Sequence, residues 1–212
     1  MRRNSLHPFC ILKTRPFRSF TTLLSLFLGT ILIGTLAGCS ESLPENPPET
    51  VSSVDLKAYA GFWYELARLP VSFQRDEELA TATYTLNEEG TVDLVNTAIR
   101  PDGTRRSVTG TAVPVTGSEN ARLKVTIDNI FARIFGSPPS HGNYWILKLE
   151  PDYSVALVGS PDRETLWLLA REPELPGPVF NRFLDHAREA GFAVDNLIVN
   201  NGAFPEEAVD DS

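Results

Sequence analysis

The chain has 212 residues, of which 42% are hydrophobic and 22% are charged, and its formal net charge is −8. This length and apolar content can bury the core of one domain, and they exclude a chain that is disordered throughout. Five of the 19 bases and none of the 27 acids precede Cys39, which leaves 14 bases against 27 acids and a net charge near −13. Because such a charge repels phosphate backbones, we expect no nucleic acid as a partner.

The first 38 residues have the pattern of an export signal. A basic segment ending at Arg18 is followed by an uncharged, largely apolar stretch that ends in small residues. This order is typical of secretory signals, whereas a permanent transmembrane helix needs about 20 apolar residues. Leu36-Ala37-Gly38-Cys39 resembles the lipobox of bacterial lipoproteins, which implies cleavage before Cys39 and acylation of its thiol, with palmitate as an expected acyl group. Ser40 stands where an Asp would signal inner-membrane retention, so we expect an anchor in the outer membrane, facing the periplasm.

The two cysteines leave no thiol for other chemistry in the mature chain. Cys10 belongs to the predicted signal and Cys39 is the lipid site, so we expect neither an intramolecular disulfide nor a cysteine-based zinc site. Prolines and glutamates after Cys39 predict a flexible tether. The expected organisation is a signal peptide over 1–38, the lipidated Cys39 and its tether over 39–53, a folded domain over 54–202 and an acidic tail over 203–212.

Between Gly61 and Arg171, short strand-like segments alternate with turn sequences. Residues 80–86, for example, alternate threonines with Ala82, Tyr84 and Leu86, the period of two expected of a strand with two different faces. We predict eight strands, over residues 62–69, 80–86, 92–99, 107–115, 122–127, 144–149, 154–159 and 166–171. Short connections favour an all-β, up-and-down antiparallel barrel that closes its own edges, over a sandwich with a solid core.

One helix is predicted after the strands. Apolar residues within 179–190 fall on one helical face, Pro176-Gly177-Pro178 precedes them and Gly191 follows. This helix should pack against the outside of the sheet, and residues 197–199 should form a short final strand.

Three blocks of the chain resemble the lipocalin family. Gly61-Phe62-Trp63-Tyr64 is similar to its Gly-x-Trp-Tyr signature, and further similarity lies in Asn143–Leu147 and Ala156–Arg171. Behind a lipobox, these blocks resemble the bacterial outer-membrane lipoprotein lipocalins, which are related to apolipoprotein D. The resemblance covers roughly 54–202 and implies an eight-stranded barrel with one C-terminal helix packed outside. It also implies a structural pair that closes one end of the barrel, with Arg171 packed across the ring of Trp63.

The period of two and the phasing implied by the family together predict the side chains that face the interior. The residues expected to contact a ligand are Glu65, Ala67, Ala82, Tyr84, Leu94, Asn96, Tyr144, Ile146, Trp167 and Leu169. A mainly aromatic and aliphatic lining with few polar groups suits an acyl chain with a polar head. Any of these residues could instead only pack the barrel, but Glu65 and Asn96 would rarely stand unpaired in a solid core.

The segment 128–141 is long and apolar for a loop. It could form a lid over the open end of the barrel, enter the bilayer beside the anchor, or tuck onto the barrel.

No motif for catalysis stands out. Asp185 and His186 diverge on a helix, and the chain has no Gly-x-Ser-x-Gly, His-Glu-x-x-His or phosphate-binding glycine loop. We therefore expect no enzyme, no cofactor and no metal. The favoured hypothesis is a membrane-anchored carrier or store of a fatty acid or lysophospholipid for envelope lipid maintenance. The alternatives are a non-catalytic scaffold with a filled barrel and, less favoured, a lipocalin-fold enzyme, and a homodimer stays open because some family members form one.

Overall fold

A computed structural model describes residues 42–128, 138–200 and 204–205. All of these residues belong to one compact unit, Ser40–Ser212. The predicted signal over 1–38, the lipidation site Cys39, most of the loop 128–141 and nearly all of the acidic tail lie outside the described residues. Within the described part, no helix is long and apolar enough to span a membrane.

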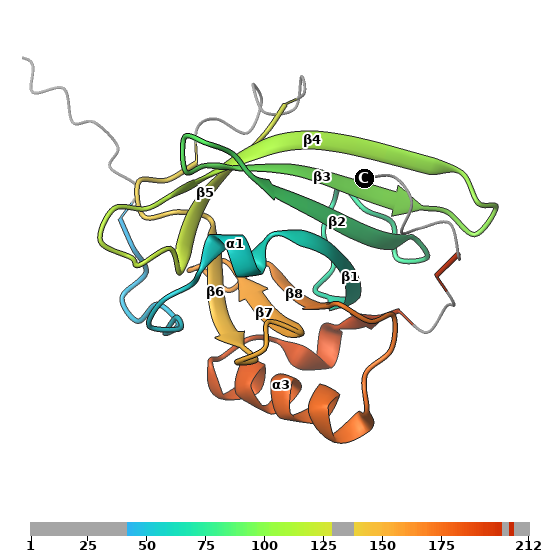
Figure 1. The fold of residues 1–212 in the computed structure, drawn as a ribbon. Coiled ribbons are helices and arrows are strands. Elements are labelled where there is room, and N and C mark those ends of the chain that lie inside the picture. Colours follow the sequence, from blue (N-terminus) through green and yellow to red (C-terminus); the bar gives the residue numbers. More distant parts are fainter. Residues whose placement is uncertain (1–41, 129–137, 201–203, 206–212) are drawn as a thin grey trace, which may run out of the picture. The chain divides into compact units, whose positions relative to one another are not determined.

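Eight antiparallel strands close into a barrel (Figure 1). They are β1 (Gly61–Arg68), β2 (Leu79–Leu86), β3 (Val92–Ile99), β4 (Arg105–Pro114), β5 (Arg122–Ile127), β6 (Tyr144–Leu149), β7 (Val155–Gly159) and β8 (Leu166–Ala170). Each strand pairs with the next in sequence, and β1 pairs with both β2 and β8, which closes the sheet. The predicted up-and-down barrel is therefore confirmed. A ninth strand, β9 (Ile198–Val199), pairs with the last residues of β1.

The barrel has one hydrophobic cluster inside and another outside. The interior cluster contains Trp63, Ala82, Tyr84, Leu94, Ile146 and Leu169, among others. The outer cluster contains the alternate residues of β1 and β6 to β8 together with Phe183 and Ala187 of helix α3 (Gly177–Glu189). Both helix residues are 0% exposed, and α3 covers strands β6 to β8 in Figure 1. The expected position of the C-terminal helix is confirmed.

A short helix that the sequence did not predict, α1 (Leu56–Tyr59), precedes the first strand. The carboxylate of Asp55 caps it by accepting hydrogen bonds from the backbone N–H groups of Lys57 and Ala58. Four residues are too few to show a helical period, so only the capping residue signals this helix in the sequence. A turn of 3-10 helix, η1 (Val194–Asn196), lies between α3 and β9.

Residues just before α1 are bound to the barrel, within the stretch 39–53 for which the sequence predicts a flexible tether. The Arg163 side chain donates a hydrogen bond of 2.7 Å to the carbonyl oxygen of Asn46. The backbone N–H of Val51 donates to Ile146, and that of Val54 donates to Glu119. These contacts hold the segment against the barrel from Asn46 onward.

Candidate functional site: the barrel interior

One end of the barrel is closed by Trp63, Arg171 and helix α1. Trp63 is 0% exposed, and its indole N–H donates to the carbonyl oxygen of Tyr59 at 2.9 Å. The guanidinium carbon of Arg171 lies 3.7 Å from the centroid of the Trp63 ring, so the expected contact between these two residues is present. Arg171 also donates hydrogen bonds to the carbonyl oxygens of five residues, Ala58, Tyr59, Ala60, Phe62 and Tyr153.

Gly61 makes this close approach possible. Its φ angle is +100°, a conformation that residues with a side chain rarely adopt. A Cβ at this position would lie 3.3 Å from Nη1 of Arg171. The positive φ angle favours glycine at this position, and the nearby Arg171 side chain adds a steric reason for it.

Three tyrosine hydroxyl groups form a chain just above this closed end. The hydroxyl oxygens of Tyr59 and Tyr144 are 2.7 Å apart, and those of Tyr84 and Tyr144 are 3.2 Å apart. Burial raises the pKa of Tyr84 to about 12 and raises the pKa values of Tyr59 and Tyr144 well above the ordinary tyrosine value. The three groups are therefore neutral at physiological pH and satisfy one another's hydrogen bonds.

Seven of the ten residues expected to contact a ligand lie in the interior cluster or against it. Ala82, Tyr84, Leu94, Ile146 and Leu169 are buried members of the cluster, and Tyr144 and Trp167 pack against it. Tyr144 and Trp167 remain partly exposed although they face inward, as do Val125 and Ile127 of β5. These inward side chains therefore retain some contact with solvent.

The expectation that Ala67 faces inward is wrong. The pairing of β1 with β8 slips by one residue between Glu65 and Ala67, so Ala67 lies opposite Leu168 and belongs to the outer cluster. Arg68 takes the inward position opposite Trp167 and is 0% exposed. A β-bulge reverses the faces of the residues that follow it. Nothing in the sequence of β1 signals the bulge, and sequence reasoning missed Arg68 for that reason.

Glu65 faces inward as expected and pairs with Arg68. Arg68 donates from Nη1 to Glu65 at 3.3 Å, and the Gln74 amide donates to the same carboxylate oxygen at 3.0 Å. Glu65 is 6% exposed, and its burial raises the pKa of its carboxyl to about 7, although Arg68 and Gln74 act to lower it. The pair therefore exists in both protonation states at neutral pH.

A second buried carboxylate, Glu78, holds the segment between β1 and β2. It is 2% exposed and forms ion pairs with Arg100 at 3.4 Å and Arg106 at 3.6 Å. Burial acts to raise the pKa of Glu78, but the backbone N–H of Arg75 and the two arginines outweigh it and hold the pKa below its usual value. Glu78 is thus an anion that ties this segment to Arg100, just after β3, and to Arg106 in β4.

Asn96 lies opposite Ala82, a member of the interior cluster, as the predicted phase requires. Its side-chain oxygen is buried and has no hydrogen-bond partner among the described atoms. A buried amide oxygen without a partner is costly, so this position is suited to a polar group that the protein does not itself supply.

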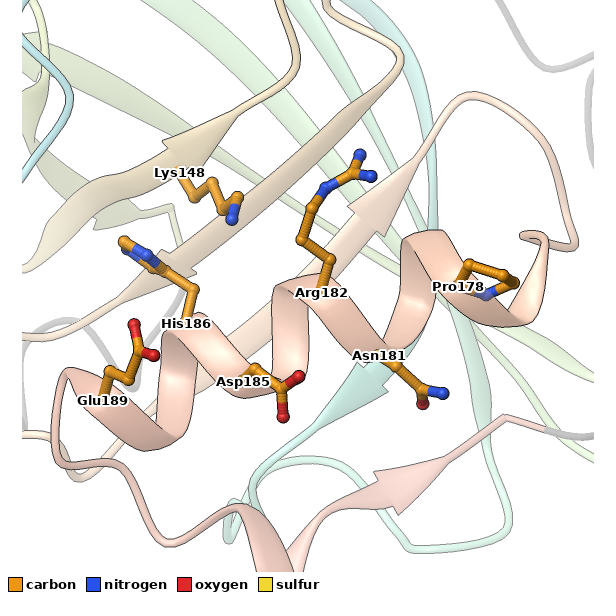
Figure 2. A pocket seen from close by; sticks show the side chains of 7 residues that line it. All are labelled: Lys148, Pro178, Asn181, Arg182, Asp185, His186 and Glu189. Carbon is orange, nitrogen blue, oxygen red and sulfur yellow. The ribbon is translucent and has the colours of Figure 1, made fainter.

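A separate cavity of about 300 Å³ lies on the outer surface beside α3 (Figure 2). It is lined by Lys148, Pro178, Asn181, Arg182, Asp185, His186 and Glu189. Asp185 and His186 point in different directions in Figure 2 and form no dyad. The cavity contains none of the residues that line the barrel. Among the residues that the structure describes, no group of three or more His, Cys, Asp or Glu side chains is arranged to hold a metal ion.

A closed eight-stranded antiparallel barrel, plugged at one end and flanked by one helix, defines the class of calyx-like β-barrels. The family model of the lipocalin-like domain matches residues 54–201. The chain belongs to the lipocalin family.

Several curated relatives share this sequence pattern. The outer membrane lipoprotein Blc of Escherichia coli K12 is 35% identical over 164 residues, which cover 77% of this chain and 88% of the relative. The protein of the same name from Vibrio cholerae is 33% identical over 175 residues, which cover 82% of this chain and 94% of the relative. Rat apolipoprotein D is 35% identical and covers 71% and 80%. The predicted resemblance to this branch of the lipocalins is confirmed.

Solved structures agree with the fold. Insecticyanin from the tobacco hornworm superposes with a TM-score of 0.53 at 18% identity, covering 79% of this chain and 89% of that structure. Apocrustacyanin C1 superposes with a TM-score of 0.54 at 16% identity, covering 79% of this chain and 98% of that structure.

Proposed function

We propose that this protein is a lipid-anchored lipocalin that binds a small amphiphile, a fatty acid or a lysophospholipid, inside its barrel. It would carry or store this lipid for maintenance of the cell envelope. The observation that supports the proposal most directly is Trp167, an inward-facing aromatic side chain that stays partly exposed within an apolar wall. Burying such a wall against an acyl chain contributes about 25 cal/mol for each Å² of apolar surface removed from water.

Polar groups inside the barrel support an amphiphile over a plain hydrocarbon. The unpartnered oxygen of Asn96 and the Glu65–Arg68 pair stand next to apolar side chains of the interior. Binding sites for small molecules combine a mostly apolar lining with a few placed polar groups.

The location and anchor are part of the proposal. The relatives at 33–35% identity include outer membrane lipoproteins, which favours an outer-membrane address for this chain. With the lipobox ending at Cys39, we infer acylation of that thiol and a barrel that faces the periplasm. Replacing Cys39 by Ser should move the protein from the membrane fraction to the soluble fraction, and mass spectrometry of the wild type should show the added acyl groups. An unmodified wild-type chain in the soluble fraction would refute the anchor.

We infer binding in preference to catalysis. Glu65 is the carboxyl with a markedly raised pKa inside the barrel, and among the described hydrogen bonds its side chain has no serine, threonine or histidine partner. A nucleophile and base within hydrogen-bonding reach would be needed for acyl transfer.

The test is a fluorescence titration of residues 40–212, the unit that contains both hydrophobic clusters, after removal of bound lipid. Palmitate, a palmitoyl lysophospholipid and retinol are added in turn. A saturable change with one ligand per barrel supports the carrier, and the ligand that binds most tightly identifies the class. A folded protein that binds none of the three supports the scaffold with a filled barrel.

Two tryptophan variants locate the binding site. Trp167 faces the interior, whereas Trp145 is buried in the outer cluster. We expect Trp167→Phe to remove most of the ligand-induced change and Trp145→Phe to retain it. The opposite result would place the ligand on the outside of the barrel and overturn the proposed site.

A further inference from the structure

In the part of the chain that the structure describes, the interior holds one buried cation whose hydrogen bonds are incomplete. Arg68 is 0% exposed and donates from Nη1 to Glu65 and from Nη2 to the carbonyl oxygen of Arg75. Its third group, the Nε–H, is buried and has no partner in the described structure. A buried guanidinium with an unused donor favours an additional acceptor, and anions fit its fork of N–H groups best.

Arg171, the arginine that closes one end of the barrel, is already satisfied. Arg171 at the closed end donates to carbonyl oxygens from both Nη atoms and from Nε, and the tyrosine hydroxyls near it bond to one another. Arg100 and Arg106 are both paired with Glu78. Among these four arginines, Arg68 is the one with an unused donor inside the barrel.

Resting on the proposed function, we propose that Arg68 binds the anionic head group of the amphiphile, a carboxylate or a phosphate, and that Glu65 takes up a proton when it does so. The acyl chain then runs along Trp167 and Leu169, which lie opposite Arg68 and Glu65 on β8 and belong to the interior wall or pack against it.

The charge balance of the site explains why Glu65 takes up a proton when an anion binds. With its pKa near 7, Glu65 neutralises Arg68 in only part of the molecules at neutral pH. An anion bound to Arg68 places two negative charges on one buried guanidinium, which disfavours ionised Glu65 and raises the pKa of its carboxyl further. Up to one proton is therefore taken up per ligand, and affinity falls as pH rises from 6 to 8.

Among the residues that the structure describes, no other group that faces this pair titrates in this range. Glu65 and Arg68 face Gln74 from the segment after β1, Asn200 after β9 and Tyr84 on β2. Gln74 and Asn200 do not ionise, and Tyr84 keeps its proton because its pKa is about 12. Glu78 bonds to the backbone of Arg75, and its pKa lies below the usual value, so it stays ionised from pH 6 to 8.

The experiment compares three ligands with the same chain: laurate, dodecyl phosphate and dodecanol. Arg68→Met should lower the affinity for both anions at least tenfold and change the affinity for dodecanol by no more than about twofold. Arg182→Met, the same change on an exposed arginine of α3, should alter none of the three. A preference for one anion over the other in the wild type tells whether the subsite takes a carboxylate or a phosphate.

A second variant keeps the test decisive if Arg68→Met does not fold. Glu65→Gln keeps the shape and the positive charge of Arg68, so anion affinity at pH 8 should rise several-fold. The anion affinity of this variant should depend less on pH. The proton uptake on binding, measured by calorimetry in two buffers, should disappear.

Equal weakening of all three ligands by Arg68→Met would overturn the proposal, and so would an unchanged pH dependence in Glu65→Gln. If the wild type binds dodecanol as tightly as it binds the anions, the proposed head-group subsite is refuted while the proposed lipid binding stands. If it binds none of them, both fail.

Discussion

Arg171 contacts the face of the Trp63 ring at 3.7 Å while it donates hydrogen bonds to the last carbonyl groups of α1. Trp63 in turn donates from its indole N–H to the carbonyl oxygen of Tyr59 in the same helix. These contacts join α1, the start of β1 and the end of β8. The helix is too short to be stable alone, so its place at the end of the barrel depends on these two side chains.

Replacing Arg171 by Met should therefore destabilise the fold. The change removes a cation–π contact and several charge-assisted hydrogen bonds, and we expect a loss of about 3 kcal/mol in the free energy of unfolding. Urea denaturation of residues 40–212 measures it. Arg182→Met, which removes an exposed ion pair with Glu150, should cost less than about 1 kcal/mol. Equal losses in the two variants would contradict the role given to Arg171.

Gly61→Ala should reduce stability more than Gly90→Ala. Both glycines have positive φ angles, +100° and +79°, but only the new Cβ at 61 would meet a neighbour, Nη1 of Arg171. We expect a loss of about 1 kcal/mol at 90 and about 2–3 kcal/mol at 61, from denaturant midpoints. The double variant Gly61→Ala/Arg171→Met should lose less than the sum, because one change removes the atom that the other would crowd. Additive losses would show that the two sites are independent.

Glu65 should make the fold less stable as pH rises. Its pKa is about 7 in the folded protein against an ordinary value of 4.5, so the folded state binds the proton more tightly. Its contribution is fully present below pH 4.5 and is lost as pH rises through 7, a difference of about 3 kcal/mol. Urea denaturation at pH 5 and pH 8 should show this decrease in the wild type, and Glu65→Gln should lack it. The same decrease in both proteins would assign the effect to other groups.

Glu78→Gln should loosen the segment between β1 and β2. Ion pairs with Arg100 and Arg106 are lost, and Arg106 also donates to the carbonyl oxygen of Phe73, which is 61% exposed. A local loss of about 1–2 kcal/mol should speed chymotrypsin cleavage after Phe73 by roughly tenfold. Mass spectrometry of the fragments gives the rate at this bond. Glu77→Gln, a change at the exposed neighbouring residue, serves as the control and should leave the rate unaltered.

Strand positions and faces followed from the sequence wherever pairing is regular. The bounds of β3, β5 and β6 agree with the predicted segments, and Tyr84, Leu94 and Ile146 lie in the interior cluster as their phase required. Alternation of side chains is a property of the extended backbone itself, so it can be read without knowing which strand lies alongside.

The sequence by itself thus determined the order of the strands, most of the inward residues and the pairing of Trp63 with Arg171 through the family resemblance. Tertiary structure decided that Arg68 and not Ala67 enters the barrel, and that α1 closes one end. The bulge in β1 depends on its register with β8, about 100 residues further along the chain. The four residues of α1 become helical where distant side chains bind their carbonyl groups. Both features depend on contacts between segments that are remote in sequence, and the local sequence signals them only through Asp55, the capping residue of α1.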